Sequence, residues 1–590
     1  MKTFTTLAVL LATTSLAAAA SNESFIAQIG ASNNALVGQA SGNNKQATIQ
    51  TGYKNSAVTS QAAAGANTNE SGIVQIGARN GAAVGQTGGN NSQGTLQVGA
   101  KNFASTSQTN SAGSKKNKSG TAQFGYANGS VVGQTAGNNT QGTLQVGASN
   151  SATTGQITNA QGGFNAARTG QFGIGNNSVT SQNSAGIAST PAVAAVPAHL
   201  EGSFPHIHLV PAVPASGGPG GNGGDNTSGV VQVGYQNNAL IGQNSVGTGN
   251  GSSARSGVEN NSTAVQVGGK NFASVSQDGT RAGTVANAAS NDSFVGQFGW
   301  ANGALVGQTG GNNSQGTLQF GAHNSATTGQ SATDDAGTNG ALTVQGGVGN
   351  NAVTSQVSSR SSVTYPILGT AVGNGGSNSA ATLQFGRGNN AVTGQDASAQ
   401  NVGLLGAPVN GVNNNALTLQ AGNSNYSSTS QAGTSYIGAS NDSFVGQFGS
   451  GNGALVGQTN GLNGQATVQI GKGNSATTGQ SNTNAGLTQN AALTVQAGRH
   501  NNAVTSQIAN PLAGGLNGSL IAQLGNGNQA SVGQTAGTGL QPMIGANLQG
   551  TVQVGNGNYA MTAQASSANV SNTSVTAQFG SHNVAVTSQH

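Results

Sequence analysis

The fold of this chain is decided by one short stretch, which first appears at residues 22–39 as NESFIAQIGASNNALVGQ and occurs in twenty copies. Its common pattern is N-x5-Q-x-G-x-x-N-x-[AS]-x-[VTI]-[GSA]-Q. In three of the copies the pattern residues are Asn22, Gln28, Gly30, Asn33, Ala35 and Gln39; Asn291, Gln297, Gly299, Asn302, Ala304 and Gln308; and Asn572, Gln578, Gly580, Asn583, Ala585 and Gln589. A short unit repeated in this way specifies a stack of similar layers.

Each copy predicts a strand, a bend and a second strand. Gly30 and the residues up to Asn33 form the bend, because glycine and asparagine adopt a positive φ at low cost. On both sides of the bend, alternate residues share one face. Two residues before the closing Gln every copy has Val, Thr or Ile, and the residue directly before that Gln is always small. The residue after the Ala or Ser varies freely, so we expect it to point outward while Ala, the β-branched residue and Gln point inward.

Buried Gln and Asn side chains are costly unless every polar atom has a partner. A parallel, in-register stack supplies these partners, since each amide donates to one neighbouring layer and accepts from the other. Four columns of amides recur: the leading Asn, the first Gln, the Asn of the bend and the closing Gln. The sequence therefore predicts an all-β fold, a parallel in-register β-solenoid of about twenty strand-arc-strand repeats with amyloid-like ladders.

The composition fits this fold better than it fits ordinary globular domains. Of the 590 residues 98 are Gly, 5% are charged and 4% are aromatic, which is too little bulky apolar material for several conventional cores. Composition alone would suggest disorder, but disorder does not require Gln at the same two places in every copy. The net charge of +5 is small for this length, and we read no nucleic-acid footprint from it.

The first twenty residues have the character of an export signal. Lys2 precedes an apolar stretch at residues 7–16, and Ala18, Ala19 and Ala20 fit a cleavage site of the A-x-A type. The apolar stretch is too short for a membrane anchor, and no later segment is long enough. We therefore expect an exported protein without a membrane span. It contains no cysteine, so disulfides do not stabilise it.

The copies fall into two blocks. After the signal at residues 1–20, residues 21–182 hold repeats 1–7 and residues 226–590 hold repeats 8–20. Residues 183–225 contain six of the ten prolines and predict a linker or surface excursion. His199, His206 and His208 in this linker form only a weak metal motif, and the GGNGGD stretch at residues 220–225 is better explained by chance than as a calcium site.

No constellation of catalytic residues accompanies the repeats. All seven Asp and four Glu residues lie outside the expected inward face. Glu23, Glu70, Asp292 and Asp442 follow the leading Asn in four different copies, which is typical of solvated charges and not of an acid–base pair. No nucleophile elbow, phosphate loop or zinc spacing is present. The sequence predicts no enzyme activity, no catalytic residue, no metal site and no cofactor.

The pattern resembles the curlin repeat of curli, the extracellular amyloid fibres of bacterial biofilms. That family's unit is S-x5-Q-x-G-x-G-N-x-A-x3-Q, and Gln28, Gly30, Asn33, Ala35 and Gln39 match it residue for residue. The same five positions match in every copy, with Ser replacing Ala in some. The leading Ser of the family is Asn here, and its second Gly is often another residue, such as Ser32 or Lys101.

The resemblance implies a secreted structural subunit that polymerises with itself into fibres at the cell surface of a Gram-negative bacterium. It further implies secretion through an outer-membrane pore, assembly started by a nucleator subunit, and a role in adhesion and the biofilm matrix. The physical pattern agrees with self-assembly, because the first and last copies carry no recognisable cap and each would offer an open edge to another chain. Head-to-tail stacking is therefore expected.

A soluble, non-polymerising β-solenoid is the alternative, either an adhesin or another surface-binding protein. An ice-binding surface would require a regular Thr array, and only Thr153, Thr327 and Thr477 occupy the variable outward position. Seven copies carry Phe after the first Gln, where it is expected to face outward, either to associate fibres laterally or to cover the strands of a monomer. These residues are Phe124, Phe172, Phe298, Phe320, Phe385, Phe448 and Phe579.

Overall fold

The computed structural model describes most of the repeats and leaves out the first 21 residues, which include the expected export signal. The described residues are 22–64, 67–110, 115–159, 163–186, 190–193, 199–201, 208–210, 216–218, 223–247, 258–279, 290–332, 337–365, 369–373, 375–401, 408–435, 440–482, 488–509, 515–536, 545–566 and 570–589. They form two units, residues 1–270 (unit 1) and 271–590 (unit 2). All their regular structure is β, and no helix among them is long and apolar enough to cross a membrane.

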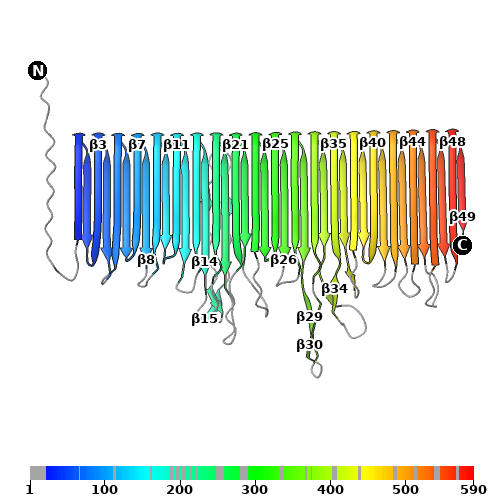
Figure 1. The fold of residues 1–590 in the computed structure, drawn as a ribbon, viewed down its shortest axis with the longest axis horizontal. Helices are drawn as coiled ribbons and strands as arrows, with labels where there is room; N and C mark the ends of the chain where they lie inside the picture. The colour runs from blue at the N-terminus through cyan, green and yellow to red at the C-terminus, as the bar shows by residue number, and fades with distance from the viewer. Residues whose placement is uncertain are drawn as a thin grey trace, which may run out of the picture. The chain divides into compact units, whose positions relative to one another are not determined.

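Unit 1 contains two parallel sheets, one from the first strand of each repeat and one from the second (Figure 1). The first strands are β1 (Asn22–Ala31), β3 (Asn43–Tyr53), β5 (Thr68–Ala78), β7 (Asn91–Ala100), β9 (Asn117–Tyr126), β11 (Asn139–Ala148), β13 (Asn165–Ile174), β19 (Asn226–Tyr235) and β21 (Glu259–Gly269). The second strands are β2 (Asn34–Ala40), β4 (Ser56–Ala63), β6 (Gly81–Gly88), β8 (Phe103–Asn110), β10 (Gly129–Thr135), β12 (Ser151–Thr158), β14 (Asn177–Ala185) and β20 (Asn238–Val246).

Unit 2 is built in the same way. Its first strands are β23 (Ser290–Trp300), β25 (Asn313–Ala322), β27 (Asn339–Val348), β31 (Asn378–Arg387), β35 (Asn413–Asn423), β38 (Ser440–Ser450), β40 (Leu462–Lys472), β42 (Gln489–Arg499), β44 (Gly515–Asn526), β46 (Gly545–Asn556) and β48 (Ser571–Ser581). Its second strands are β22 (Phe272–Asp278), β24 (Gly303–Gly310), β26 (Ser325–Ala332), β28 (Asn351–Ser358), β32 (Asn390–Asp396), β36 (Tyr426–Ala432), β39 (Gly453–Thr459), β41 (Ser475–Asn482), β43 (Asn502–Ala509), β45 (Gln529–Ala536), β47 (Tyr559–Ser566) and β49 (Val584–Gln589).

Successive repeats pair in register, pattern residue to pattern residue. Asn22 lies opposite Asn44 and Gln28 opposite Gln50 in the first sheet, while Gln39 lies opposite Gln61 in the second. The same register holds in unit 2, for example between β23 and β25 and between β24 and β26. The predicted parallel β-solenoid of strand-arc-strand repeats is confirmed.

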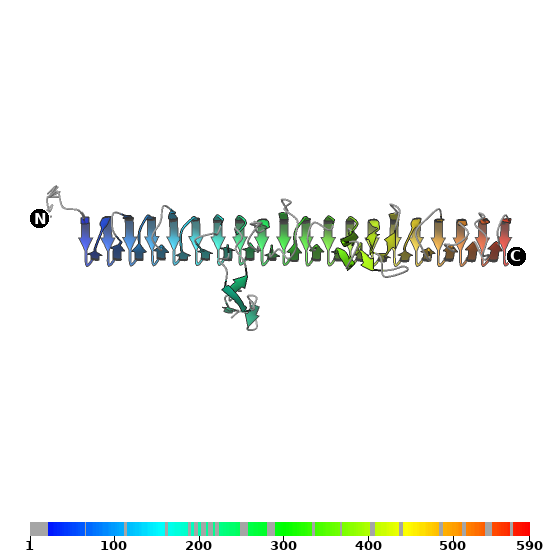
Figure 2. The same ribbon diagram turned by 90° about the horizontal axis from the view of Figure 1, so that it is seen from below.

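The interior between the two sheets is narrow and largely polar. Figure 2 shows the two strands of a repeat in two layers, and the side chains that fill the space between them are the inward ones of the pattern. In the second repeat the buried residues are Asn44, Gln46, Thr48, Gln50, Asn55, Ala57, Thr59 and Gln61. The variable Val58 is 38% exposed, as expected for an outward position. Alternation of buried and exposed residues along each strand follows from its two-residue period.

The two edges of each unit differ. At the arc edge, the bend runs from the pattern glycine to the following Asn, as in Gly30 to Asn33, and has the same length in every copy. At the return edge the chain crosses from the closing Gln to the next leading Asn over a variable distance. In Figure 1 the short strand β15 (Thr190–Val193) of unit 1 and the strands β29 (Ser361–Tyr365) and β30 (Gly369–Gly373) of unit 2 lie at this edge.

The proline-rich segment of unit 1 is an insertion between neighbouring repeats. β13 pairs with β19 and β14 with β20, so repeat 7 stacks directly on repeat 8. β14 continues to Ala185, three residues into the predicted linker, because Asn183 and Ser184 pair with Asn244 and Ser245. Beyond it, β15 (Thr190–Val193) pairs antiparallel with β18 (Ser216–Gly218), and β16 (His199–Glu201) with β17 (His208–Val210).

Unit 2 carries smaller insertions at its return edge. After β28 the chain forms an antiparallel hairpin of β29 (Ser361–Tyr365) and β30 (Gly369–Gly373) before it enters β31. The short strands β33 (Gln400–Asn401), β34 (Pro408–Gly411) and β37 (Thr434–Ser435) pair in the same antiparallel manner. None of these pairings interrupts the stacking of β27 on β31 or of β31 on β35.

Candidate functional site

The candidate site is the set of contacts by which one repeat binds the next. The two Gln columns form continuous side-chain ladders along each unit. In the first column the Nε2 of Gln28 donates to the Oε1 of Gln50 at 2.6 Å, and Gln50 donates in turn to Gln75 at 2.7 Å. In the second column Gln39 donates to Gln61 at 2.8 Å. Gln297 and Gln308 of unit 2 donate to the corresponding Gln residues of the next repeat at 2.8 and 2.9 Å.

Gln residues that lie between two repeats use their second amide hydrogen to tie the two sheets together. Gln50 also donates to the carbonyl oxygen of Asn34 at 2.9 Å, and Gln61 donates to that of Lys45 at 3.1 Å. These carbonyls belong to the opposite sheet. A buried amide with both hydrogens and its oxygen engaged pays no penalty for an unsatisfied polar atom, which is why an interior of this composition is possible.

The two Asn columns run in the opposite direction. The Nδ2 of Asn44 donates back to the Oδ1 of Asn22 at 2.7 Å, and the arc Asn55 donates back to Asn33 at 3.2 Å. Asn324 shows the full arc arrangement. Its backbone N–H and its Nδ2 both donate to the Oδ1 of Asn302 at 3.1 Å, and the Nδ2 donates forward to the carbonyl of Gly347 at 3.1 Å.

The pattern glycine brings neighbouring arcs into close approach. Gly299 has a φ of +124°, and a Cβ placed on it would lie 2.0 Å from the carbonyl oxygen of Gly321 in the next repeat. The same overlap recurs at Gly30, where the oxygen of Gly52 would lie 2.0 Å away. The requirement for glycine therefore comes from contact between repeats as well as from the backbone conformation of the bend.

The residue before the arc Asn is also in the left-handed region. Its φ lies between +52° and +68° in every copy, and thirteen copies place a residue other than glycine there. These include Lys54 (φ +56°), Lys101 (φ +58°) and His582 (φ +58°). Lys54 and Lys101 lie over the rings of Tyr53 and Tyr126, at 5.0 and 4.9 Å from the ring centroids.

Every repeat thus has two chemically different stacking sides. The side toward the following repeat offers Gln amide hydrogens and Asn carbonyl oxygens, while the side toward the preceding repeat offers Gln oxygens and Asn amide hydrogens. In the first described repeat the inward Gln28 is exposed and Gln39 is half-buried, since one side of this repeat is uncovered. In the last described repeat Asn583, Ala585 and Gln589 are half-buried, and Gln589 donates only to the carbonyl of Thr573 at 3.0 Å.

A further contact between repeats was not foreseen from the pattern. At the second position after the leading Asn, six repeats carry Gln and the preceding repeat carries Ser. Ser24 donates to Gln46 at 3.0 Å, and Ser519 donates to Gln549 at 3.0 Å. Each of these Gln residues also bonds the Thr two residues later, as Gln46 bonds Thr48. The other pairs are Ser71 and Gln93, Ser119 and Gln141, Ser293 and Gln315, and Ser443 and Gln465.

The remaining sequence predictions fall at the surface or outside the described residues. Phe320, Phe385 and Phe448 are 44%, 44% and 37% exposed, and the rings of Phe298 and Phe320 stack with centroids 5.2 Å apart. The described residues contain no group of three metal-binding side chains. His206 and residues 220–222 lie outside the described residues, and the carboxylate of Asp225 accepts a hydrogen bond from the N–H of Phe164 at 2.8 Å.

The comparisons with known proteins add no family to this geometry. No protein-family model matches the chain, and a search of curated proteins finds no match. The resemblance to the curlin repeat therefore stands on the pattern residues alone, and the function inferred from it is a proposal.

Proposed function

We propose that this protein is a secreted structural subunit that stacks on copies of itself to form an extracellular, curli-like amyloid fibre, which serves adhesion and the biofilm matrix of a Gram-negative bacterium. The observation that carries the proposal is the sameness of the contact between repeats. Gln binds Gln and Asn binds Asn at successive steps, with donors and acceptors always in the same sense. A repeat that binds its neighbour in this way is equally suited to bind the corresponding repeat of another chain.

The polarity of the ladders makes the proposed contact specific. A following-side surface carries free Gln hydrogens where a preceding-side surface carries Gln oxygens, and the Asn columns match in the reverse sense. Two surfaces of the same kind would oppose donor to donor. Stacking is therefore head-to-tail, and the fibre has a direction. The export signal expected at residues 1–20 and the resemblance to the curlin repeat support the extracellular location.

Seeded polymerisation tests this function. The mature chain at micromolar concentration is followed by thioflavin fluorescence with and without preformed fragments, and the product is examined by fibre diffraction. We expect growth without a lag when fragments are added, and reflections near 4.8 and 10 Å. A chain that stays monomeric and folded in the presence of fragments would contradict the proposal and favour a soluble solenoid adhesin.

A matched pair of variants reports on the ladders themselves. Gln39→Leu removes the half-buried amide of the first described repeat, which donates to Gln61, with little change of side-chain size. Leu36→Gln alters an outward residue of the same strand that is 63% exposed. The first variant is expected to slow addition at the end of the fibre that presents this repeat, and the second to leave the rate unchanged. Equal elongation of both variants would show that the ladders do not form the contact.

A further inference from the structure

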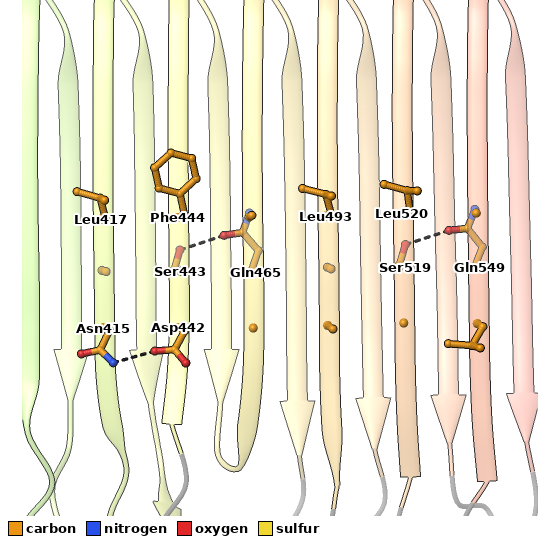
Figure 3. Close-up of a pocket in the computed structure, with 18 of the residues that line it drawn as sticks. Asn415, Leu417, Asp442, Ser443, Phe444, Gln465, Leu493, Ser519, Leu520 and Gln549 are labelled. Carbon is orange, nitrogen blue, oxygen red and sulfur yellow. Dashed lines mark hydrogen bonds between the residues drawn. The ribbon is translucent and has the colours of Figure 1, made fainter.

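The outer face of the first strands in unit 2 is unusually apolar. Large side chains occupy the third and seventh positions after the leading Asn of most repeats between 13 and 20. Leu417, Leu493 and Leu520 at the third position are 40%, 40% and 41% exposed, and Ile470 and Leu524 at the seventh are 50% and 45% exposed. Figure 3 shows Leu417, Phe444, Leu493 and Leu520 in one row across neighbouring strands. We call this surface, from β31 to β48, the apolar face.

Small side chains form a shallow trough beside these rows. At the first position after the leading Asn, repeats 16–18 carry Gly464, Ala491 and Gly518, and all three line the same hollow as the row of leucines, whereas repeat 19 has Leu548 there. The charged residue of the rows in repeats 13–20 is Asp442, which accepts a hydrogen bond from Asn415 at 2.7 Å (Figure 3). The rows of the apolar face therefore carry one charge, and the exposed cations Arg387, Lys472 and Arg499 lie at the arc end of β31, β40 and β42, outside the rows.

The outer face of the second strands has a different character. Within one repeat, the outward residues of β40 are Gly464, Ala466, Val468 and Ile470, whereas those of β41 are Ser475, Thr477, Gly479 and Ser481. If both faces were only exposed to solvent, both would be expected to carry small polar residues such as those of β41. An extended exposed apolar surface marks an interaction site. On the second strands, exposed apolar residues such as Leu455 and Val504 are interspersed with Ser, Thr and Gly and line no common hollow with the first-strand rows.

The dimensions of the apolar face match those of a stable interface between proteins. Eight strands at about 4.8 Å spacing, each contributing about seven residues of about 3.3 Å, give on the order of 800 Å². A standard interface buries about that area on each partner. Because the ridges repeat with the spacing of strands, the surface that can interdigitate with them along this whole length is another sheet with the same spacing.

We propose that the apolar face binds the apolar face of a second copy of this chain, so that two stacks associate laterally, sheet against sheet. We relate the two copies by a two-fold axis parallel to the stacking direction. The strands of the two facing sheets then run in opposite directions, while both stacks keep the same polarity. When this axis passes over the fourth position, Ile470 and Leu524 at the seventh position of repeats 16 and 18 face the small Gly464 and Gly518 of the other copy. The third position then faces the fifth, which is also apolar, with Leu419, Val468 and Val495 in repeats 14, 16 and 17.

The inference rests on the proposed function, because lateral pairing concerns stacks of the chain. The mass per unit length of the fibres, measured by scanning transmission electron microscopy, distinguishes lateral pairing from stacking alone. We expect the unmodified fibre to have twice the mass per length of a fibre made from the double variant Leu493→Lys, Leu520→Lys. The control Leu455→Lys, Val504→Lys changes exposed residues on the outer face of β39 and β43, and should keep the full value.

A cross-link tests the register without charging the surface. The chain has no cysteine, and repeat 17 has alanine at both the first and seventh positions, Ala491 and Ala497. With a bis-maleimide that spans about 8 Å, chains with Ala491→Cys mixed with chains with Ala497→Cys are expected to be joined between copies, since packed sheets lie about 10 Å apart. Chains with Ala491→Cys mixed with chains with Ser506→Cys, an exposed residue on the outer face of β43, are not.

The outcomes are distinct. Fibres whose mass per length is the same in the Leu493→Lys, Leu520→Lys variant and in the unmodified chain, or the absence of the cross-link between positions 491 and 497, would overturn lateral pairing and leave stacking intact. A chain that forms no fibre and no cross-linked dimer would contradict both proposals. Halved mass per length together with the selective cross-link would establish the paired sheets.

Discussion

The arc edge and the return edge of the repeats obey different rules, although the same chain passes through both. From the pattern glycine to the arc Asn the length is constant in every copy. Between the closing Gln and the next leading Asn, the chain uses as few as the four residues 40–43 or inserts hairpins such as β29 and β30. The arc edge therefore sets the register of the stack, whereas the return edge tolerates connections of different length.

Contact distances explain this difference. At the arc, the glycines of adjacent repeats approach so closely that a Cβ would overlap the neighbouring carbonyl, and the Asn side chain bonds the repeats on both sides. At the return edge, the leading Asn44 also bonds Asn22 and Asn69, but its other bonds go to the local carbonyls of Ala40 and Ser41, at 3.2 and 2.8 Å. A local bond of this kind adapts to a loop of any length, because the closure cost of a loop rises slowly with its length.

The largest effect is expected from adding a methyl group at the arc glycine. Gly299→Ala places a Cβ 2.0 Å from the carbonyl oxygen of Gly321 at a φ of +124°, and should lower the local stability of repeats 10 and 11 by about 4 kcal/mol or more. Hydrogen–deuterium exchange of β23 to β26 measures this. The control Gly307→Ala, in the outward part of the same repeat, has no atom within 4 Å of the new methyl and should protect the same peptides at least as well as Gly307 does.

A smaller loss is expected when the arc amide is removed. Asn324→Ala deletes the bonds of this side chain to the backbone of Phe320 and Gly347 and to the Asn residues on either side, and should cost about 3 kcal/mol. The matched change is Asn351→Ala, which removes one exposed-edge bond to Asn390 at 3.1 Å and should cost about 0.5 kcal/mol. Urea unfolding of the two variants compares them. Equal losses would mean that the arc has no special part in setting the register.

Much of this organisation was accessible from the sequence because the constraint is repeated. Residues that face inward must be compatible with their own copies above and below, so Gln50 and Gln61 recur while Val58 varies. The in-register parallel stack and the direction of each side chain follow from this rule. The arc glycine was predicted for its conformation, whereas its approach to the next arc depends on a distance between repeats that no single repeat encodes.

The Ser–Gln pairs show where the pattern was not sufficient. Ser24 and Gln46 occupy the same position in successive copies, and other copies have Ala there, so an average over the copies records only a variable residue. The pairing can be recognised only by comparing each repeat with the one before it. A Gln at this position occurs where the preceding repeat has Ser, and a Thr follows the Gln two residues later. The bond from Gln50 to the opposite sheet was likewise out of reach, because it depends on how the two sheets face each other.

Relief of backbone strain at the arc should have a favourable and smaller effect. Ala301 has a φ of +54°, and Ala301→Gly should raise the stability of its repeat by about 1 kcal/mol, since the left-handed region costs an alanine about that much. Ala304→Gly, three residues further on and fully buried in β24, should instead lower stability by about 1 kcal/mol. Urea midpoints of the two variants give the signs. A loss of stability in both would show that the arc conformation is not strained.

The smallest effect is expected at the return edge, where the largest piece of chain can be removed. Replacing residues 359–375, which contain β29 and β30, by two glycines should change the stability of the flanking repeats by less than about 1 kcal/mol. Ser358 and Gly376 already lie side by side, since the Ser358 hydroxyl donates to the Gly376 carbonyl at 2.8 Å. Inserting the same two glycines between Ala322 and His323, at the arc, should separate the Asn ladder and expose β25 to β28 to hydrogen exchange. If the deletion at the return edge opened β28 and β31 as strongly as the insertion opens the arc, both edges would share in setting the register, and the difference between them would be one of sequence length only.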